Sequence, residues 1–100
     1  MDMQKLMKQA QKMQNDMAKA QEKLKEMKVE GVAGGGMVKV VATGGNEIVD
    51  IQINPEVVDP EDVEMLQDLI LAAINEAMKN ASELASSEMS KVTGGIKMPF

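Results

Sequence analysis

The stretch VEGVAGGGMVKVVATGGNEIVDIQI, Val29 to Ile53, decides the fold of this chain. It contains three short runs rich in β-branched residues, and clusters of glycine separate one run from the next. Runs of this kind with glycine turns between them are typical of strands joined by hairpins. We therefore predict a three-stranded antiparallel sheet with strands over residues 28–33, 37–43 and 48–53.

Apolar and polar residues alternate along the second and third predicted strands, so the two faces of the sheet should differ. The predicted apolar face consists of Val38, Val40, Ala42, Val49, Ile51 and Ile53. A sheet of three short strands cannot cover this face by itself. Helices or a second copy of the chain must supply the cover.

The residues before the sheet, 3–27, carry an apolar heptad pattern. Its members follow one another at alternating steps of three and four: Met3, Leu6, Ala10, Met13, Met17, Ala20, Leu24 and Met27. A period of 3.5 keeps one stripe facing a partner along a helix. The stripe is thin, and methionine fills gaps without fixing a register. We predict a helical arm whose root, residues 20–27, packs on the body of the protein or on a partner subunit.

A second long helix is predicted over residues 60–89, with Asp59 as its N-cap and Pro60 at its first position. Its apolar stripe is wider than one small sheet needs, so part of the stripe should meet a second subunit. Gly94 and Gly95 disfavour any continuation of the helix. The predicted organisation is a single domain, residues 1–90, followed by a flexible tail, residues 91–100.

Composition argues against an enzyme, because the chain has no His, Cys, Arg, Trp or Tyr, and Phe100 is its only aromatic residue. The usual general bases, nucleophiles and transition-metal ligands are therefore missing. We expect no cofactor, no metal and no small-molecule substrate. The chain also has no apolar run near 18 residues, so we expect a cytoplasmic protein without a membrane partner.

Three local features could indicate a binding site, but each has a simpler structural explanation. Gly34 to Gly36 lie between predicted strands, whereas a phosphate loop needs a helix after its glycines, so a hairpin turn is favoured. The acidic residues between 56 and 68 lack the spacing of a calcium loop, so helix capping is favoured. The eleven methionines are attributed to packing in the core rather than to copper binding.

The net charge of −5 hides a strong asymmetry. Residues 1–28 hold seven lysines against four carboxylates, a net charge of +3, whereas residues 29–100 have a net charge of −8. The predicted first helix is thus the basic part of an acidic protein, with lysines away from the apolar stripe. The candidate DNA-binding residues are Lys5, Lys8, Lys12, Lys19 and Lys23.

A lysine stripe on a helix is consistent with a solvated face, nucleic-acid binding or membrane binding. Membrane binding is disfavoured because the apolar stripe lacks bulky aromatic anchors. Single-strand binding is disfavoured because the chain has no aromatic residues before Phe100 on which bases could stack. Duplex DNA remains, bound through its phosphates, since a protein without arginine cannot form the bidentate contacts that read guanine.

The sequence resembles the YbaB/EbfC nucleoid-associated proteins of bacteria over nearly its whole length. The resemblance rests on four segments: Gly35 to Val40, PEVVDPEDVEMLQDLIL from Pro55 to Leu71, Ala72 to Ala77, and Val92 to Gly95. It implies an α+β chain of order α-β-β-β-α with the sheet between two long helices. It also implies a homodimer whose helices project like the arms of a tweezer.

The resemblance further implies a DNA-binding protein of the nucleoid that acts in nucleoid organisation and gene regulation. No family motif assigns individual contacts, so the five lysines rest on charge and helix position alone. The main alternative is a dimeric helical scaffold or adaptor that captures another protein.

Overall fold

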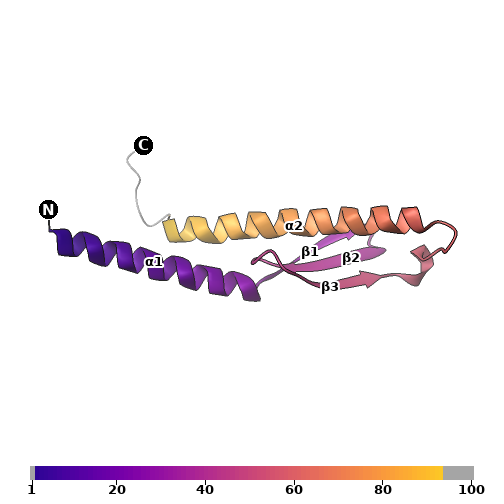
Figure 1. The fold of residues 1–100 in the computed structure, drawn as a ribbon. Helices are drawn as coiled ribbons and strands as arrows, with labels where there is room; N and C mark the ends of the chain where they lie inside the picture. Colours follow the sequence, from indigo (N-terminus) through magenta and orange to yellow (C-terminus); the bar gives the residue numbers. More distant parts are fainter. Residues whose placement is uncertain (1, 94–100) are drawn as a thin grey trace, which may run out of the picture.

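The computed structural model describes residues 2–93 of the 100-residue chain. The strands form one antiparallel sheet in the order β1-β2-β3, and the helices lie before and after it in sequence (Figure 1). The molecule is elongated, with extents of 70 × 26 × 16 Å. This arrangement confirms the predicted α+β class and the order α-β-β-β-α. The elements are α1 (Met3–Glu26), β1 (Lys28–Ala33), β2 (Val38–Thr43), β3 (Ile48–Ile53), the short 3-10 helix η1 (Pro55–Val57) and α2 (Val63–Thr93).

The second helix differs most from its predicted bounds. It begins at Val63 instead of residue 60, because Asp59 to Asp62 close a turn in which the Asp62 amide donates to the Asp59 carbonyl at 3.0 Å. Asp62 is therefore the cap, and its carboxylate accepts from the Met65 amide at 3.2 Å. The helix continues to Thr93, so the first residues of the predicted tail are helical, and residues 94–100 lie outside the described part.

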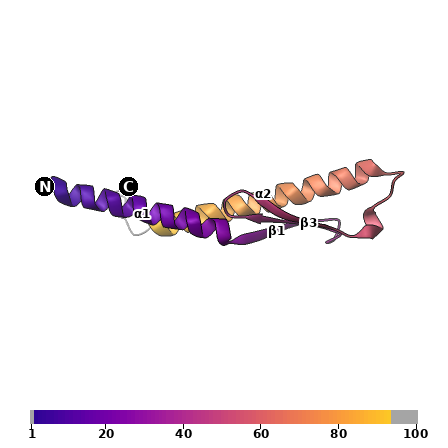
Figure 2. The same cartoon turned by 60° about the horizontal axis from the view of Figure 1, so that its bottom comes forward.

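The core lies between α2 and the sheet, and small side chains build most of it. Ala73, Ala77 and Ala81 of α2 are fully buried, as are Val38 and Val40 of β2. The three alanines recur every fourth residue and so form one stripe along the helix. Because their side chains are short, α2 lies close against β1 and β2 (Figure 2).

Gly31 of β1 is the position where α2 comes closest to the sheet. A Cβ atom added to Gly31 would lie 2.8 Å from the Ala77 Cα and would also overlap the Ala73 carbonyl oxygen and the Ala77 amide nitrogen. Only glycine leaves room for the helix backbone at this point. The close approach of α2 thus explains why β1 contains glycine at this position, although glycine has a low strand propensity.

The third strand departs from the predicted alternation. A register shift opposite Val41 and Ala42 leaves Ile48 paired with Ala42 and Asp50 paired with Val41. Val49 is the extra residue of this bulge, and its side chain lies on the outer face of the sheet with Asp50. The predicted placement of Val49 with Ile51 and Ile53 is therefore wrong.

The root of α1 packs on the body, as the heptad pattern predicted, whereas its first half is exposed. Ala20 and Leu24 are buried, and Leu24 rests against Gly44, where an added Cβ would lie 2.6 Å from the leucine Cδ2. In this single chain Met3, Leu6 and Ala10 are exposed. Among the described methionines none is fully buried; Met78 packs against the edge of the core, so methionine contributes to the packing only from its periphery.

One buried carboxylate joins the two helices near this root. Glu88 of α2 accepts from Lys91 on its own helix at 3.0 Å and from Lys23 on α1 at 3.4 Å. The hydrogen bond from Lys91 is the main cause that holds the pKa of Glu88 below its ordinary value; desolvation opposes it, and the bond from Lys23 reinforces it. Glu88 therefore remains ionised in the folded protein at neutral pH.

The glycine and acidic segments take the plain roles that the sequence favoured. Gly34, Gly35 and Gly36 all have positive φ and form the hairpin turn between β1 and β2. Asp59 accepts from the Glu61 amide at 2.9 Å, so this carboxylate, like that of Asp62, serves a local turn or cap.

Replacing Gly31 with Ala should destabilise the protein by about 3 kcal/mol, because the new methyl group would push the α2 backbone away from β1. The measurement is urea unfolding of G31A. Gly45→Ala is the control, since its Cβ would come closest to the flexible Lys25 side chain, at 3.3 Å, and would meet Thr43 Oγ1 and the Lys25 Cα only at ordinary contact distances of 3.5 and 3.8 Å; it should be nearly neutral. Equal effects of the two substitutions would contradict the packing argument.

Replacing Glu88 with Gln should lower the melting temperature at neutral pH. Because the pKa of Glu88 is lowered by folding, the ionised group stabilises the folded state above its ordinary pKa of 4.5, and this stabilisation is lost as the pH falls through the lower pKa of the folded state. The melting temperatures of E88Q and the parent, followed by circular dichroism, should therefore converge below pH 4.5. A difference that stays constant down to about pH 3 would contradict the ion pairing.

Candidate nucleic-acid interface

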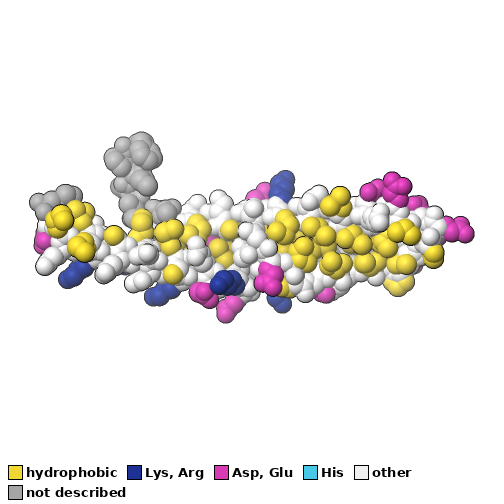
Figure 3. All heavy atoms as spheres, in the orientation of Figure 1, with side chains coloured by type: hydrophobic (Ala, Val, Ile, Leu, Met, Phe, Trp, Pro, Cys, Tyr) yellow, Lys and Arg dark blue, Asp and Glu magenta, His cyan; other side chains and the backbone are white. Residues whose placement is uncertain are grey.

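The five predicted lysines lie along one side of α1, and all of them are exposed. Lys5, Lys8, Lys12 and Lys19 recur at helical spacing, and none forms an ion pair with another described residue. Dark blue side chains lie along the lower edge of the α1 half of the molecule in Figure 3. The structure therefore places a row of free ammonium groups on the arm that projects beyond the sheet.

Lys23, the fifth predicted residue, differs from the other four because its ammonium group is paired with the buried carboxylate of Glu88. Its side chain still has 61% of its surface exposed. The charge of Lys23 is thus partly neutralised from within the protein, which separates it from the distal lysines.

Lys91 is a basic residue that the sequence interpretation missed. A shallow groove runs between α1 and the last turns of α2, and it is lined by Asp16, Lys19, Ala20, Lys23, Glu88, Lys91 and Val92. In this groove the second helix adds a cation to the stripe on the first. Because Glu88 and Lys91 are three residues apart, they lie on the same face of a helix, and this spacing is the one local signal in the sequence for the pair. Their position beside α1 could not be inferred from the sequence.

The two ends of the molecule carry opposite charge. The arm, Met3–Glu26, holds six lysines and three carboxylates. At the far end, five carboxylates follow β3 within a short stretch: Glu56, Asp59, Glu61, Asp62 and Glu64. Magenta side chains mark this end in Figure 3. A polyanion is therefore attracted to the arm and repelled by the opposite end.

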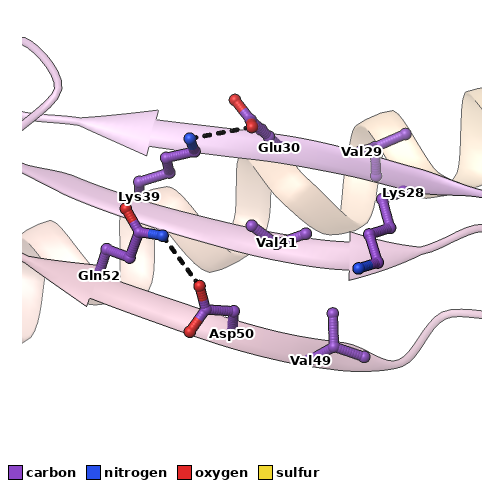
Figure 4. A pocket seen from close by; sticks show the side chains of 8 residues that line it. All are labelled: Lys28, Val29, Glu30, Lys39, Val41, Val49, Asp50 and Gln52. Carbon is purple, nitrogen blue, oxygen red and sulfur yellow. Dashed lines mark hydrogen bonds and ion pairs between the residues drawn. The ribbon is translucent and has the colours of Figure 1, made fainter.

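The outer face of the sheet forms a shallow hollow that holds two lysines, Lys28 and Lys39, and two carboxylates, Glu30 and Asp50 (Figure 4). Lys39 forms an ion pair with Glu30 at 3.0 Å, and Gln52 donates to Asp50 at 3.0 Å. The hollow has a balanced set of charges, in contrast to the row on α1. This face offers less attraction to a polyanion than the arm does.

An apolar surface faces solvent on the other side of the sheet, where α2 does not reach β3. Ile48, Ile51 and Ile53 pair with Ala42, Val40 and Val38 and so point to the same face as the core, yet each has more than a third of its surface exposed. Figure 3 shows a continuous hydrophobic patch over this part of the molecule. We call the three isoleucines the β3 face.

Two further properties concern the described residues as a group. Between residues 2 and 93, no three or more acidic, histidine or cysteine side chains come together in a way that could bind a metal ion. No described helix has the length and apolar character needed to span a membrane.

Comparison with known proteins gives a consistent picture. The model of the YbaB/EbfC DNA-binding family matches residues 1–96. A nucleoid-associated protein of Pelotomaculum thermopropionicum is 61% identical over 98% of this chain and 93% of its own length. One from Acetivibrio thermocellus is 65% identical over 91% of this chain and 80% of its own length.

A solved structure supports the same grouping. The crystal structure of the uncharacterized protein HP0035 from Helicobacter pylori matches with a TM-score of 0.76 and 31% identity, covering 87% of this chain and 91% of that one. A family described by DNA binding agrees with the prediction that this chain is not an enzyme. The length of the match and the shared fold together show that the chain belongs to the YbaB/EbfC DNA-binding family.

Proposed function

We propose that this protein binds duplex DNA as a homodimer, mainly through phosphate contacts from α1, and that it acts in the nucleoid in DNA organisation and gene regulation. The observation that carries the proposal is the row of unpaired lysines on the projecting arm of an otherwise acidic protein. The names of the relatives, nucleoid-associated proteins, support the cellular setting.

Lysine ammonium groups neutralise phosphates as point charges and carry little sequence information. If the four free lysines on each of two arms contact one phosphate each, about eight counterions are released, and log affinity falls with log salt at a slope of about −7. Binding of this kind is strongly salt dependent and weakly specific. The acidic end of the molecule keeps the DNA on the arms.

The homodimer is supported by the β3 face. The core of a single chain is small, since Val38 and Val40 are its largest fully buried side chains. Covering Ile48, Ile51 and Ile53 with the same surface of a second copy would enlarge the apolar core and remove these side chains from water. A symmetric pair would also supply two basic arms.

A dimeric scaffold is the second candidate function, and one observation favours it. Met3 and Met7 near the tip of α1 have 73% and 61% of their surface exposed, so the arm also presents an apolar stripe that a partner helix could cover. In this case DNA binding would be weak or absent at cytosolic salt. The experiment below separates the two functions.

Replacing Lys5, Lys8 and Lys12 with Gln should weaken DNA binding and reduce its salt dependence. Losing three phosphate contacts per chain would bring the log-log slope from about −7 to about −2. Fluorescence anisotropy with a labelled duplex of about 20 base pairs, from 50 to 300 mM salt, measures both quantities.

The matched control is Lys28, Lys39 and Lys79→Gln, which removes the same charge from the sheet and from the exposed side of α2. This variant should keep most of the affinity and slope. Equal losses in the two triple variants would contradict binding by the arm. If the unaltered protein does not bind at tens of micromolar and 150 mM salt, the scaffold function is favoured.

Replacing Ile51 with Lys should convert the dimer to a monomer, because a second copy would bury the new charge without a partner. If burying the unpaired charge costs about 3 kcal/mol or more of association free energy, the dissociation constant of the dimer rises at least about 100-fold. Val49→Lys is the control: it is equally exposed in the single chain, 46% against 44%, but on the outer face. Sedimentation velocity gives the mass of each variant, and a dimeric I51K would place the interface elsewhere.

A further inference from the structure

Glu88 is a charged residue that is buried between the two helices. It has 6% of its surface exposed and lies in the last two turns of α2. Burial of a carboxylate at this point requires cations nearby. Lys23 of α1 and Lys91 of α2 supply them, one from each wall of the groove.

These contacts separate two groups of lysines on the two helices. Lys5, Lys8, Lys12 and Lys19 of α1 have no described ion-pair partner, whereas Lys23 of α1 and Lys91 of α2 share the Glu88 carboxylate. Within the groove, three lysines face two carboxylates, Asp16 and Glu88. The groove therefore has a local charge of +1, and it would have +2 without Glu88.

We propose that Glu88 limits the affinity of the groove for DNA phosphates by holding the ammonium groups of Lys23 and Lys91. The inference rests on the proposed function, DNA binding through the lysines of α1. It assigns Lys91 as a further phosphate contact, contributed by α2, and Glu88 as the residue that restrains it.

The carboxylate and a phosphate compete for the same two cations. Charge-assisted hydrogen bonds to a buried carboxylate are stronger and less screened by salt than contacts at the open surface. A phosphate arriving from solvent must therefore share or displace an existing partner. The side chains of Lys23 and Lys91 remain 61% and 68% exposed, so the phosphate can reach them. Glu88 thus attenuates binding in the groove without blocking it.

The test replaces Glu88 with Gln, which has nearly the same shape and lacks the charge. DNA affinity at about 150 mM salt should rise on the order of threefold to tenfold, and the log-log salt slope should steepen by up to about two per chain. Glu83→Gln is the matched control: it makes the same charge change at an exposed position of α2 without a described ion pair. It should change the affinity much less.

Circular dichroism would first show that E88Q is folded at the assay temperature. Affinity that is unchanged or weaker in folded E88Q, or a rise that E83Q matches, would overturn the proposal.

A second comparison leaves Glu88 in place and so remains informative if E88Q does not fold. Lys12→Gln and Lys23→Gln each remove one charge from α1, but only Lys23 is already held by Glu88. K23Q should therefore cost less affinity than K12Q, and equal costs would overturn the inference. If the parent binds DNA and K12Q weakens it while E88Q and E83Q behave alike, the proposed function stands and only the role of Glu88 fails.

Discussion

The close packing of α2 on β1 is the constraint on which the rest of the structure depends. Three alanines at intervals of four residues meet a strand that has glycine at the crossing point, so the backbones come together with almost no side chain between them. This contact places α2 over β1 and β2 and leaves β3 beyond its reach. The β3 face is therefore exposed in the single chain, and the core of alanine and valine under α2 buries little apolar area.

The length of α2 has a second consequence. Thirty-one residues make a helix of about 46 Å, whereas six-residue strands span about 20 Å. The overhang gives the root of α1 a surface to pack on, through Ala20 and Leu24, and brings Glu88 against Lys23. The first half of α1 extends past the end of this support. The protein thereby separates a packed, acidic body from a basic arm.

This packing gives lysines on the same side of α1 different electrostatic surroundings. Lys12 and Lys23 occupy the same side of one helix, but only the second lies beside a buried carboxylate from another element. The sequence alone suggests a uniform basic stripe on α1. In the structure the lysines near the tip have no described ion-pair partner, whereas the charge of Lys23 at the root is partly neutralised. Its charge pattern is a property of two helices rather than of one.

The sequence by itself determined the strands, the hairpin glycines, the two helices and the basic character of the first, because these depend on local propensity and periodicity. It did not determine the start of α2, where two aspartates compete to cap the helix, or the face of Val49, which a bulge reverses. Only the tertiary structure decided which lysines are free, since Glu88 and Lys23 lie 65 residues apart in sequence. Contacts between distant residues depend on how helices pack, and that packing leaves no local pattern.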